Sequence, residues 1–205
     1  MAVTINASTS TGLVQSADTS GQIELQTNGT TKLTVSSTGV NIGQYNPSTS
    51  LITSGTAVAS TSGTSIDFTG IPSWVKRITV MLNRVSTNGS SNFLARLGTS
   101  SGVVSSGYSC ACAYSNASGA STSNFTTGIG LINAFAASDT ISGLLIIANV
   151  SGNIWSAFGN FNLAANPNIN YTAGNIDLGG TLDRVRITTV GTDTFDAGSI
   201  NILYE

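Results

Sequence analysis

The side chains that could do chemistry are few and widely spaced. Histidine is absent, which excludes His-based catalytic triads and removes both the commonest general base and the commonest metal ligand. Nine carboxylates are present, at Asp18, Glu24, Asp67, Asp139, Asp177, Asp183, Asp193, Asp196 and Glu205. Two of them could flank a sugar as in a glycosidase, but such enzymes need an extended groove with aromatic platforms on a longer chain. We therefore expect a non-enzymatic protein without catalytic residues.

Two short motifs resemble metal sites without meeting their requirements. Cys110 and Cys112 are two residues apart, so on a strand both side chains point to the same face. A Cys-x-Cys pair lacks the four ligands of a structural zinc site, and we expect two buried thiols and no disulfide framework. The segment Asp193–Asp196 lacks the alternating oxygen ligands of an EF-hand loop. We expect no metal and no cofactor, and a structural ion between strands is the alternative.

Charge is scarce throughout the chain. Charged residues make up 8% of the sequence, against about 25% in an average globular protein, and the net charge is −2. The seven basic residues are scattered, whereas a nucleic-acid site needs a dense basic stripe. A trimer could still gather copies of Arg184 and Arg186 into one patch. We expect no nucleic-acid partner, and so few charges favour self-association.

No segment of the sequence predicts a membrane partner. The longest apolar run is Leu144–Val150, far short of the roughly 20 residues that a membrane helix needs. Residues 1–20 have neither a basic region nor a continuous apolar stretch, so they do not resemble a secretory signal. We expect a soluble protein made in a cytoplasm.

The pattern of residues 52–205 predicts an antiparallel β-sandwich. Apolar residues make up 40% of the chain, enough for a core, and helical periodicity is nearly absent. Within Val75–Arg84 and within Leu182–Val190, apolar and polar residues alternate, which is typical of a half-buried strand. In Leu144–Val150 the residues that would point to either face of a strand are apolar, which predicts a strand buried on two sides. Turn clusters separate such runs, so we expect a jelly-roll-like sandwich of about eight or more strands.

Residues 1–51 predict a short β-rich arm. Two pieces, Gln22–Thr27 and Lys32–Val35, are joined by Asn28-Gly29, a strong hairpin signal, and a third piece covers Val40–Ile42. Apolar side chains are too few here to close a core within one chain, and a lone hairpin is marginal in water. We therefore expect the arms to intertwine in a homotrimer. The predicted trimer and attachment interface consists of Ile23, Leu25, Leu33, Val35, Val40 and Ile42.

Other arrangements of the arm stay open. The hairpin could dock on the sandwich of its own chain, or the arm could be partly disordered. The stretch Gln44–Ser54, rich in Ser, Thr and Asn, resembles a linker between the arm and the sandwich.

Aromatic residues near predicted loops could bind a sugar. The segments Gly119–Asn124 and Asn166–Asn170 read as exposed loops, and Trp155 and Tyr171 lie close to the second in sequence. Aromatic rings beside a polar loop can form a glycan-binding platform, so these two residues are candidates for a receptor or glycan surface. The alternative is that the rings fill the sandwich core or a trimer seam.

Several segments resemble known proteins. Residues 20–42, SGQIELQTNGTTKLTVSSTGVNI, resemble the openings of many bacteriophage fibre-like and virion-associated proteins. Residues 65–82, SIDFTGIPSWVKRITVML, with DRVRITT at 183–189 and DTFDAGSINILYE at 193–205, are similar to a domain of phage structural proteins. The resemblance covers about half of the chain and implies trimeric β-rich fibres, spikes or head decorations with jelly-roll-like tips. It supplies no catalytic residues.

These observations lead to an expected function at the surface of a phage particle. We expect a structural component of a bacteriophage virion, most simply a trimeric capsid decoration (cement) or head-fibre protein attached through its arm. Its partners would be itself and the phage major capsid protein or another virion protein, and it would be assembled in the host bacterial cytoplasm. The alternative is a short tail fibre or tip protein that binds a host surface glycan or receptor. A short arm without a helical shaft favours direct seating on a capsid.

Overall fold

The computed structural model of the chain describes residues 21–42, 52–165 and 167–205. The chain divides into two compact units, Met1–Leu51 and Ile52–Glu205, at the boundary predicted between arm and sandwich. In the described ranges every regular element is a β-strand and every strand pairing is antiparallel, so the all-β prediction is confirmed. No described segment forms a helix that could cross a membrane. Residues 1–20 and most of the predicted linker, 44–54, lie outside the described ranges.

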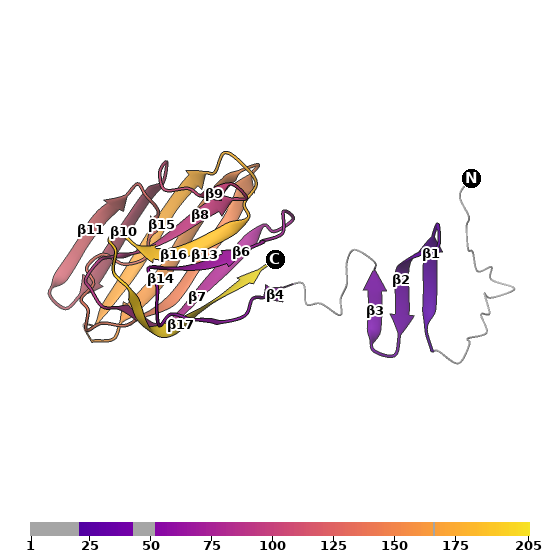
Figure 1. Cartoon of the computed structure of the whole chain (residues 1–205), viewed down its shortest axis with the longest axis horizontal. Helices are drawn as coiled ribbons and strands as arrows, with labels where there is room; N and C mark the ends of the chain where they lie inside the picture. The colour runs from indigo at the N-terminus through magenta and orange to yellow at the C-terminus, as the bar shows by residue number, and fades with distance from the viewer. Residues whose placement is uncertain (1–20, 43–51, 166) are drawn as a thin grey trace, which may run out of the picture. The chain divides into compact units, whose positions relative to one another are not determined.

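The first unit contains a three-stranded sheet in the order β1-β2-β3. Its strands are β1 (Ile23–Thr27), β2 (Thr30–Ser36) and β3 (Gly39–Ile42). Asn28 and Gly29 have φ values of 49° and 71°, as a two-residue type I′ turn requires at both central positions. The hairpin predicted from this pair is confirmed, and Figure 1 shows β3 added beside β2.

The second unit is a sandwich of two unequal sheets. The larger sheet has nine strands in the order β11-β10-β15-β14-β13-β7-β17-β4, with β5 also paired to β17. They are β4 (Thr53–Ser54), β5 (Val58–Ala59), β7 (Arg77–Thr87), β10 (Ser109–Asn116), β11 (Gly119–Phe125), β13 (Ile141–Ser151), β14 (Ile154–Leu163), β15 (Asn168–Asp177) and β17 (Phe195–Tyr204).

The smaller sheet has five strands in the order β12-β8-β16-β6, with β9 paired to β8. They are β6 (Ser65–Thr69), β8 (Phe93–Thr99), β9 (Gly102–Val103), β12 (Ile129–Gly130) and β16 (Arg184–Thr189). Figure 1 shows the larger sheet curled, with β6, β8 and β16 lying across one side of it.

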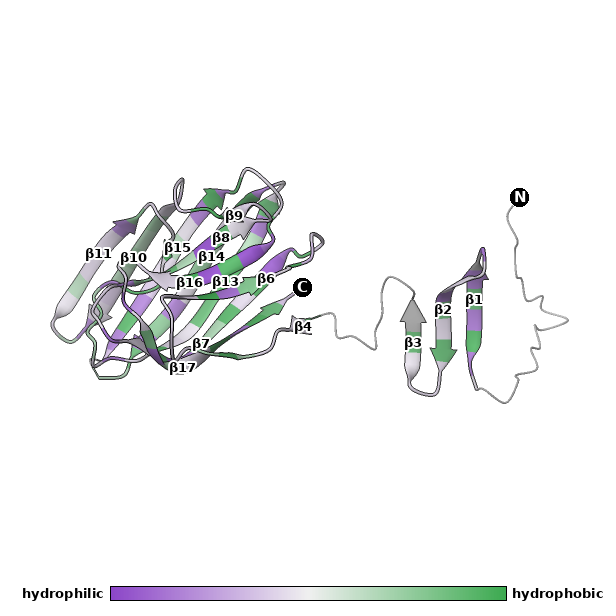
Figure 2. Cartoon of the chain, viewed as in Figure 1, coloured by the Kyte–Doolittle hydropathy of each residue, from purple (hydrophilic) through white to green (hydrophobic). Residues whose placement is uncertain are grey.

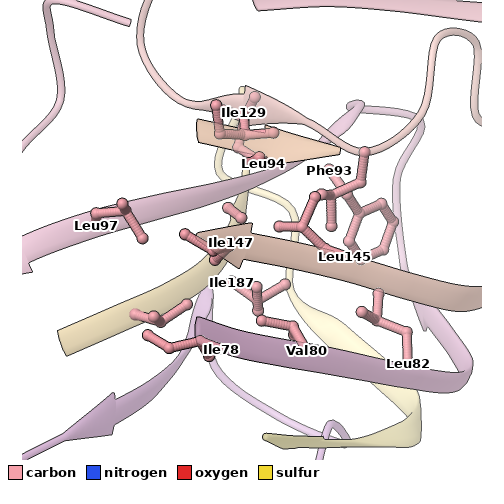
Figure 3. Packing of buried hydrophobic residues seen from close by; sticks show 14 of the residues in the cluster. Ile78, Val80, Leu82, Phe93, Leu94, Leu97, Ile129, Leu145, Ile147 and Ile187 are labelled. Atoms are coloured by element: carbon pink, nitrogen blue, oxygen red, sulfur yellow. The ribbon is translucent and has the colours of Figure 1, made fainter. Parts of the chain in front are cut away.

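The core lies between the two sheets because alternation along each strand sends every second side chain inward. The alternation predicted in residues 75–84 and 182–190 is confirmed, since Ile78 and Val80 on β7 and Val185 and Ile187 on β16 are fully buried. Figure 3 shows where the sheets meet, through Ile78, Val80, Leu82, Leu145 and Ile147 of the larger sheet and Phe93, Leu94, Leu97, Ile129 and Ile187 of the smaller sheet.

Three local predictions are wrong. The exposed loop predicted at Asn166–Asn170 is contradicted at Asn168–Asn170, which begin β15, and Asn170 is fully buried because it points inward from that strand. Leu144–Val150, predicted to be buried on two sides, forms most of β13, but Leu144 is 50% exposed, because the smaller sheet covers only the inner face. Gly119–Asn124, predicted to be a loop, forms most of β11, an edge strand paired with β10. Its small polar side chains lack the apolar alternation of a half-buried strand because the strand is largely exposed.

Candidate assembly face and binding cavity

The predicted interface residues of the arm share one face of its sheet. The register places Val35 opposite both Ile23 and Val40, and Leu33 opposite both Leu25 and residue 42. Residues directly opposite each other in an antiparallel pair point to the same side. The two rows therefore form one apolar face, which we call the arm face.

The arm face is exposed within its own unit. Ile23, Leu25, Val35 and Val40 are between 37% and 49% exposed, and Leu33 is half-buried. The side chain of Ile42 lies outside the described part of the chain. Figure 2 shows apolar and polar residues alternating along β1 and β2.

The opposite face of the arm sheet is polar and internally hydrogen-bonded. The Glu24 carboxylate accepts hydrogen bonds from Gln26 Nε2 and Thr31 Oγ1, each 3.0 Å long. Those side chains are satisfied while exposed to water. The arm sheet thus has one polar face and one apolar face. The apolar face is the one that would gain stability from a second packing layer.

An open surface cavity of about 420 Å³ lies where three connecting segments of the sandwich meet. Its walls are Asn116–Ser118 in the β10–β11 turn, Ala134–Ala136 and Asp139 after β12, and Pro167 and Asn168 at the start of β15. The turns are neighbours because Ser115 pairs with Ile169 at the adjoining ends of β10 and β15. Asn166, part of a predicted loop, lies outside the described residues.

Amide hydrogen bonds hold the segment after β12 beside this cavity. Asn133 N donates to Asn170 Oδ1 at 3.0 Å, and Ser123 Oγ donates to Asn133 Oδ1 at 2.7 Å. Ala134 N donates to Asn92 Oδ1 at 3.0 Å, and Ala134 has φ of 88°, a strained value for a residue with a side chain. Such strain persists only where the surroundings determine the conformation, and it is often found at ligand sites.

The cavity wall combines one acid with neutral groups. Asp139 is 1% exposed, and its backbone N–H donates to Ala136 O at 2.8 Å. No basic side chain is among the described residues of the wall, which includes the apolar surfaces of Phe135 and Pro167. Because Asp139 is almost completely buried, its carboxylate does not face an incoming molecule. The accessible wall consists of neutral polar groups such as Asn116 and Ser118 and of apolar surfaces, a lining that suits a neutral molecule.

Trp155 and Tyr171 do not form the predicted platform. Trp155 is 5% exposed and points into the core, whereas Tyr171 is 47% exposed on the outer face of the larger sheet. The prediction is wrong for Trp155, because strand alternation turns its ring inward. Tyr171 stays a candidate surface residue.

Other polar groups named from the sequence have partners within the chain. Asp193 Oδ2 accepts from Ser91 N at 2.7 Å, and Asp196 accepts from the Ser86 hydroxyl. Both carboxylates therefore have structural roles that do not require an ion. Arg186 forms two 2.7 Å hydrogen bonds to Asp67 on β6, and Arg184 pairs with Asp183. Each of these arginines is thus neutralised locally.

The two cysteines are free thiols on the inner face of β10, as predicted. Cys110 is 6% exposed and Cys112 is fully buried. Cys110 Sγ accepts a hydrogen bond from Gly130 N at 3.3 Å. Burial, and secondarily the neighbouring Cys110, raises the pKa of Cys112 from 9.0 to about 12. Both effects disfavour the reactive thiolate.

We expect the native protein to resist thiol alkylation by iodoacetamide at pH 9. Cys112 stays protonated well above this pH because its pKa is about 12, while an unfolded cysteine ionises near pH 8.5. Mass spectrometry should find few alkylated chains without denaturant and two labels per chain in guanidinium. Rapid labelling of the folded protein would contradict the burial of this pair.

The chain was also compared with known proteins. No family model, no curated protein and no solved structure matches it. The likeness of residues 20–42 to phage fibre-like proteins therefore stays a prediction from the sequence.

Proposed function

We propose that this chain is a non-enzymatic structural component of a bacteriophage virion, namely a homotrimeric capsid decoration or head-fibre protein attached through its arm. The observation that carries the proposal is the one-sided arm sheet, whose apolar face its own described strands leave exposed. The segment that resembles phage fibre-like openings, residues 20–42, includes all three strands of this sheet.

Burial of the arm face supplies a driving force for assembly. Complete burial of a Val, Leu or Ile side chain stabilises by about 1.5–3 kcal/mol, so a half-exposed residue gains roughly 1 kcal/mol when it is covered. Three flat sheets can close around one axis with every apolar face turned inward. Each chain then covers the face that another chain leaves open.

We expect Val35→Asp to convert the trimer into monomers. The substitution places an unpaired charge in the apolar seam, at a cost on the order of several kcal/mol. Size-exclusion chromatography with light scattering measures the change. Thr34→Lys is the matched control, because it adds a charge to the same strand on the opposite face, across from Glu24. An unchanged trimer for Val35→Asp would show that the arm face does not hold the assembly.

We expect antibody against the chain to label phage heads in negative-stain images. Particles that lack the chain should assemble intact heads, with equal or reduced stability, and should still adsorb to host cells. Loss of adsorption with intact heads, together with label on the tail, would contradict a decoration role and favour a tail fibre.

The second candidate function, a tail-tip protein that binds a host glycan, is favoured by the cavity around Asp139. Its volume falls within the range of about 300–1,000 Å³ typical of small-molecule sites. Its accessible wall has neutral polar groups at Asn116 and Ser118 beside apolar surfaces, which suits the hydroxyl and C–H groups of a neutral sugar. The strained Ala134 beside it also marks a segment held in place by its neighbours.

If the cavity binds sugar, saturation-transfer NMR should detect at least one of glucose, galactose, mannose and N-acetylglucosamine. Ala136→Trp, which fills the cavity, should weaken binding at least tenfold. Asn175→Ala is the control, because Asn175 is exposed at the opposite end of β15 from Asn168. No transfer from any of these sugars, or equal binding by Ala136→Trp, would remove the glycan role from this cavity.

A further inference from the structure

The outer face of the larger sheet carries a group of large apolar side chains, here called the outer patch. It consists of Leu144 and Ile146 on β13, Phe158 on β14, and Ile169 and Tyr171 on β15. Ile146 lies directly opposite Phe158, and Asn160 lies opposite both Leu144 and Tyr171. Opposite and diagonal neighbours on one face of an antiparallel sheet are within contact range. The five residues therefore form one continuous patch over three adjacent strands.

The outer patch is large for a surface left in water. Leu144, Phe158, Ile169 and Tyr171 are between 47% and 57% exposed. An aromatic side chain has about 150–250 Å² of surface, so Phe158 and Tyr171 alone leave roughly 200 Å² exposed, and Leu144 and Ile169 enlarge this area. Patches of about 300–600 Å² are the largest on typical monomers and are often functional. A stable interface buries about 800 Å² on each partner, so the patch and its border could form the centre of one.

Charge distinguishes this face from the back of the smaller sheet. There, Arg186 pairs with Asp67 across β16 and β6, and Arg96 lies opposite Arg186 on β8. On β13, β14 and β15, all of whose outward positions the structure describes, the one charged outward residue is Asp177 at the end of β15. Depletion of charge with aromatic enrichment characterises the centre of a protein interface.

We propose that the outer patch packs against copies of itself, so that the sandwich domains hold the trimer together as well as the arms. This inference rests on the homotrimer proposed above and names a second surface for it. A copy of the same face is the matching partner, because both surfaces are uncharged and apolar. Side chains on both faces of β13 are largely apolar. In this arrangement both faces become buried, as is usual for such strands.

In a threefold assembly the three outer patches face the common axis. Each patch then contacts the patches of both neighbours, and the charged backs of the smaller sheets remain in solvent. The outer patch adds its buried area to that of the arm face.

The test compares Phe158→Asp and Tyr171→Ser with Val190→Asp in the full chain. Val190 is also an exposed apolar residue, 51% exposed, but it follows β16 and lies outside the larger sheet. Light scattering over a dilution series should show both patch variants dissociating at a concentration at least tenfold higher than the wild type, while Val190→Asp behaves like the wild type. Because Phe158 is exposed in the single chain, circular dichroism should show each variant still folded.

Hydroxyl-radical footprinting gives a second readout. Phe158 and Tyr171 should be protected in the wild-type trimer and labelled in the monomers of Val35→Asp. A trimer in which Phe158 is labelled, or patch variants that dissociate as the wild type does, would overturn the inference while leaving arm-driven assembly intact. A wild-type chain that is monomeric at all concentrations would overturn both. Protection of the patch only on adding one of the four sugars, in a chain that stays monomeric, would assign it to a saccharide instead.

Discussion

A β-sheet has two faces, and in each unit the described part of this chain leaves at least one face of the main sheet uncovered. In the sandwich, the smaller sheet fills the inner side of the larger one with fully buried residues such as Leu145 and Ile147. In the arm, three strands of four to seven residues leave no second layer among the described residues. Apolar side chains on an uncovered face gain stability only when something else covers them. Both uncovered faces therefore carry apolar side chains that remain in contact with water in the single chain.

The distribution of charge decides which surfaces remain in water. Some of the few charges form pairs, such as Arg186 with Asp67 on the back of the smaller sheet and Arg77 with Glu205 near strand ends. Such exposed pairs add little stability, about 0–1 kcal/mol each. Their main effect is to keep those surfaces hydrated. The back of the larger sheet lacks this protection over β13, β14 and β15.

The same rigid sandwich positions the cavity. Adjoining ends of β10 and β15 bring two turns together, and amide side chains from Asn92 and Asn170 hold the segment after β12 against them. The wall that these segments form presents neutral polar groups and apolar surfaces to the cavity.

From the sequence alone, the all-β class, the antiparallel pairing, the Asn28-Gly29 hairpin and the division near residue 51 could be predicted, because each follows from local alternation or turn chemistry. The sequence could also predict that Cys110 and Cys112 share a buried face.

The sequence could not predict that Trp155 points inward while Tyr171 points outward, or that Asp139 meets the turns beside Asn116 and Asn168. Alternation along a strand does not determine which set of alternate residues faces the core. Only the packing of distant strands places residues from separate turns around one cavity. For the same reason, the sequence could not predict that one face of β13 is exposed. A strand that is apolar on both sides is usually buried on both faces. Only the arrangement of the two sheets shows which face of β13 its own chain leaves uncovered.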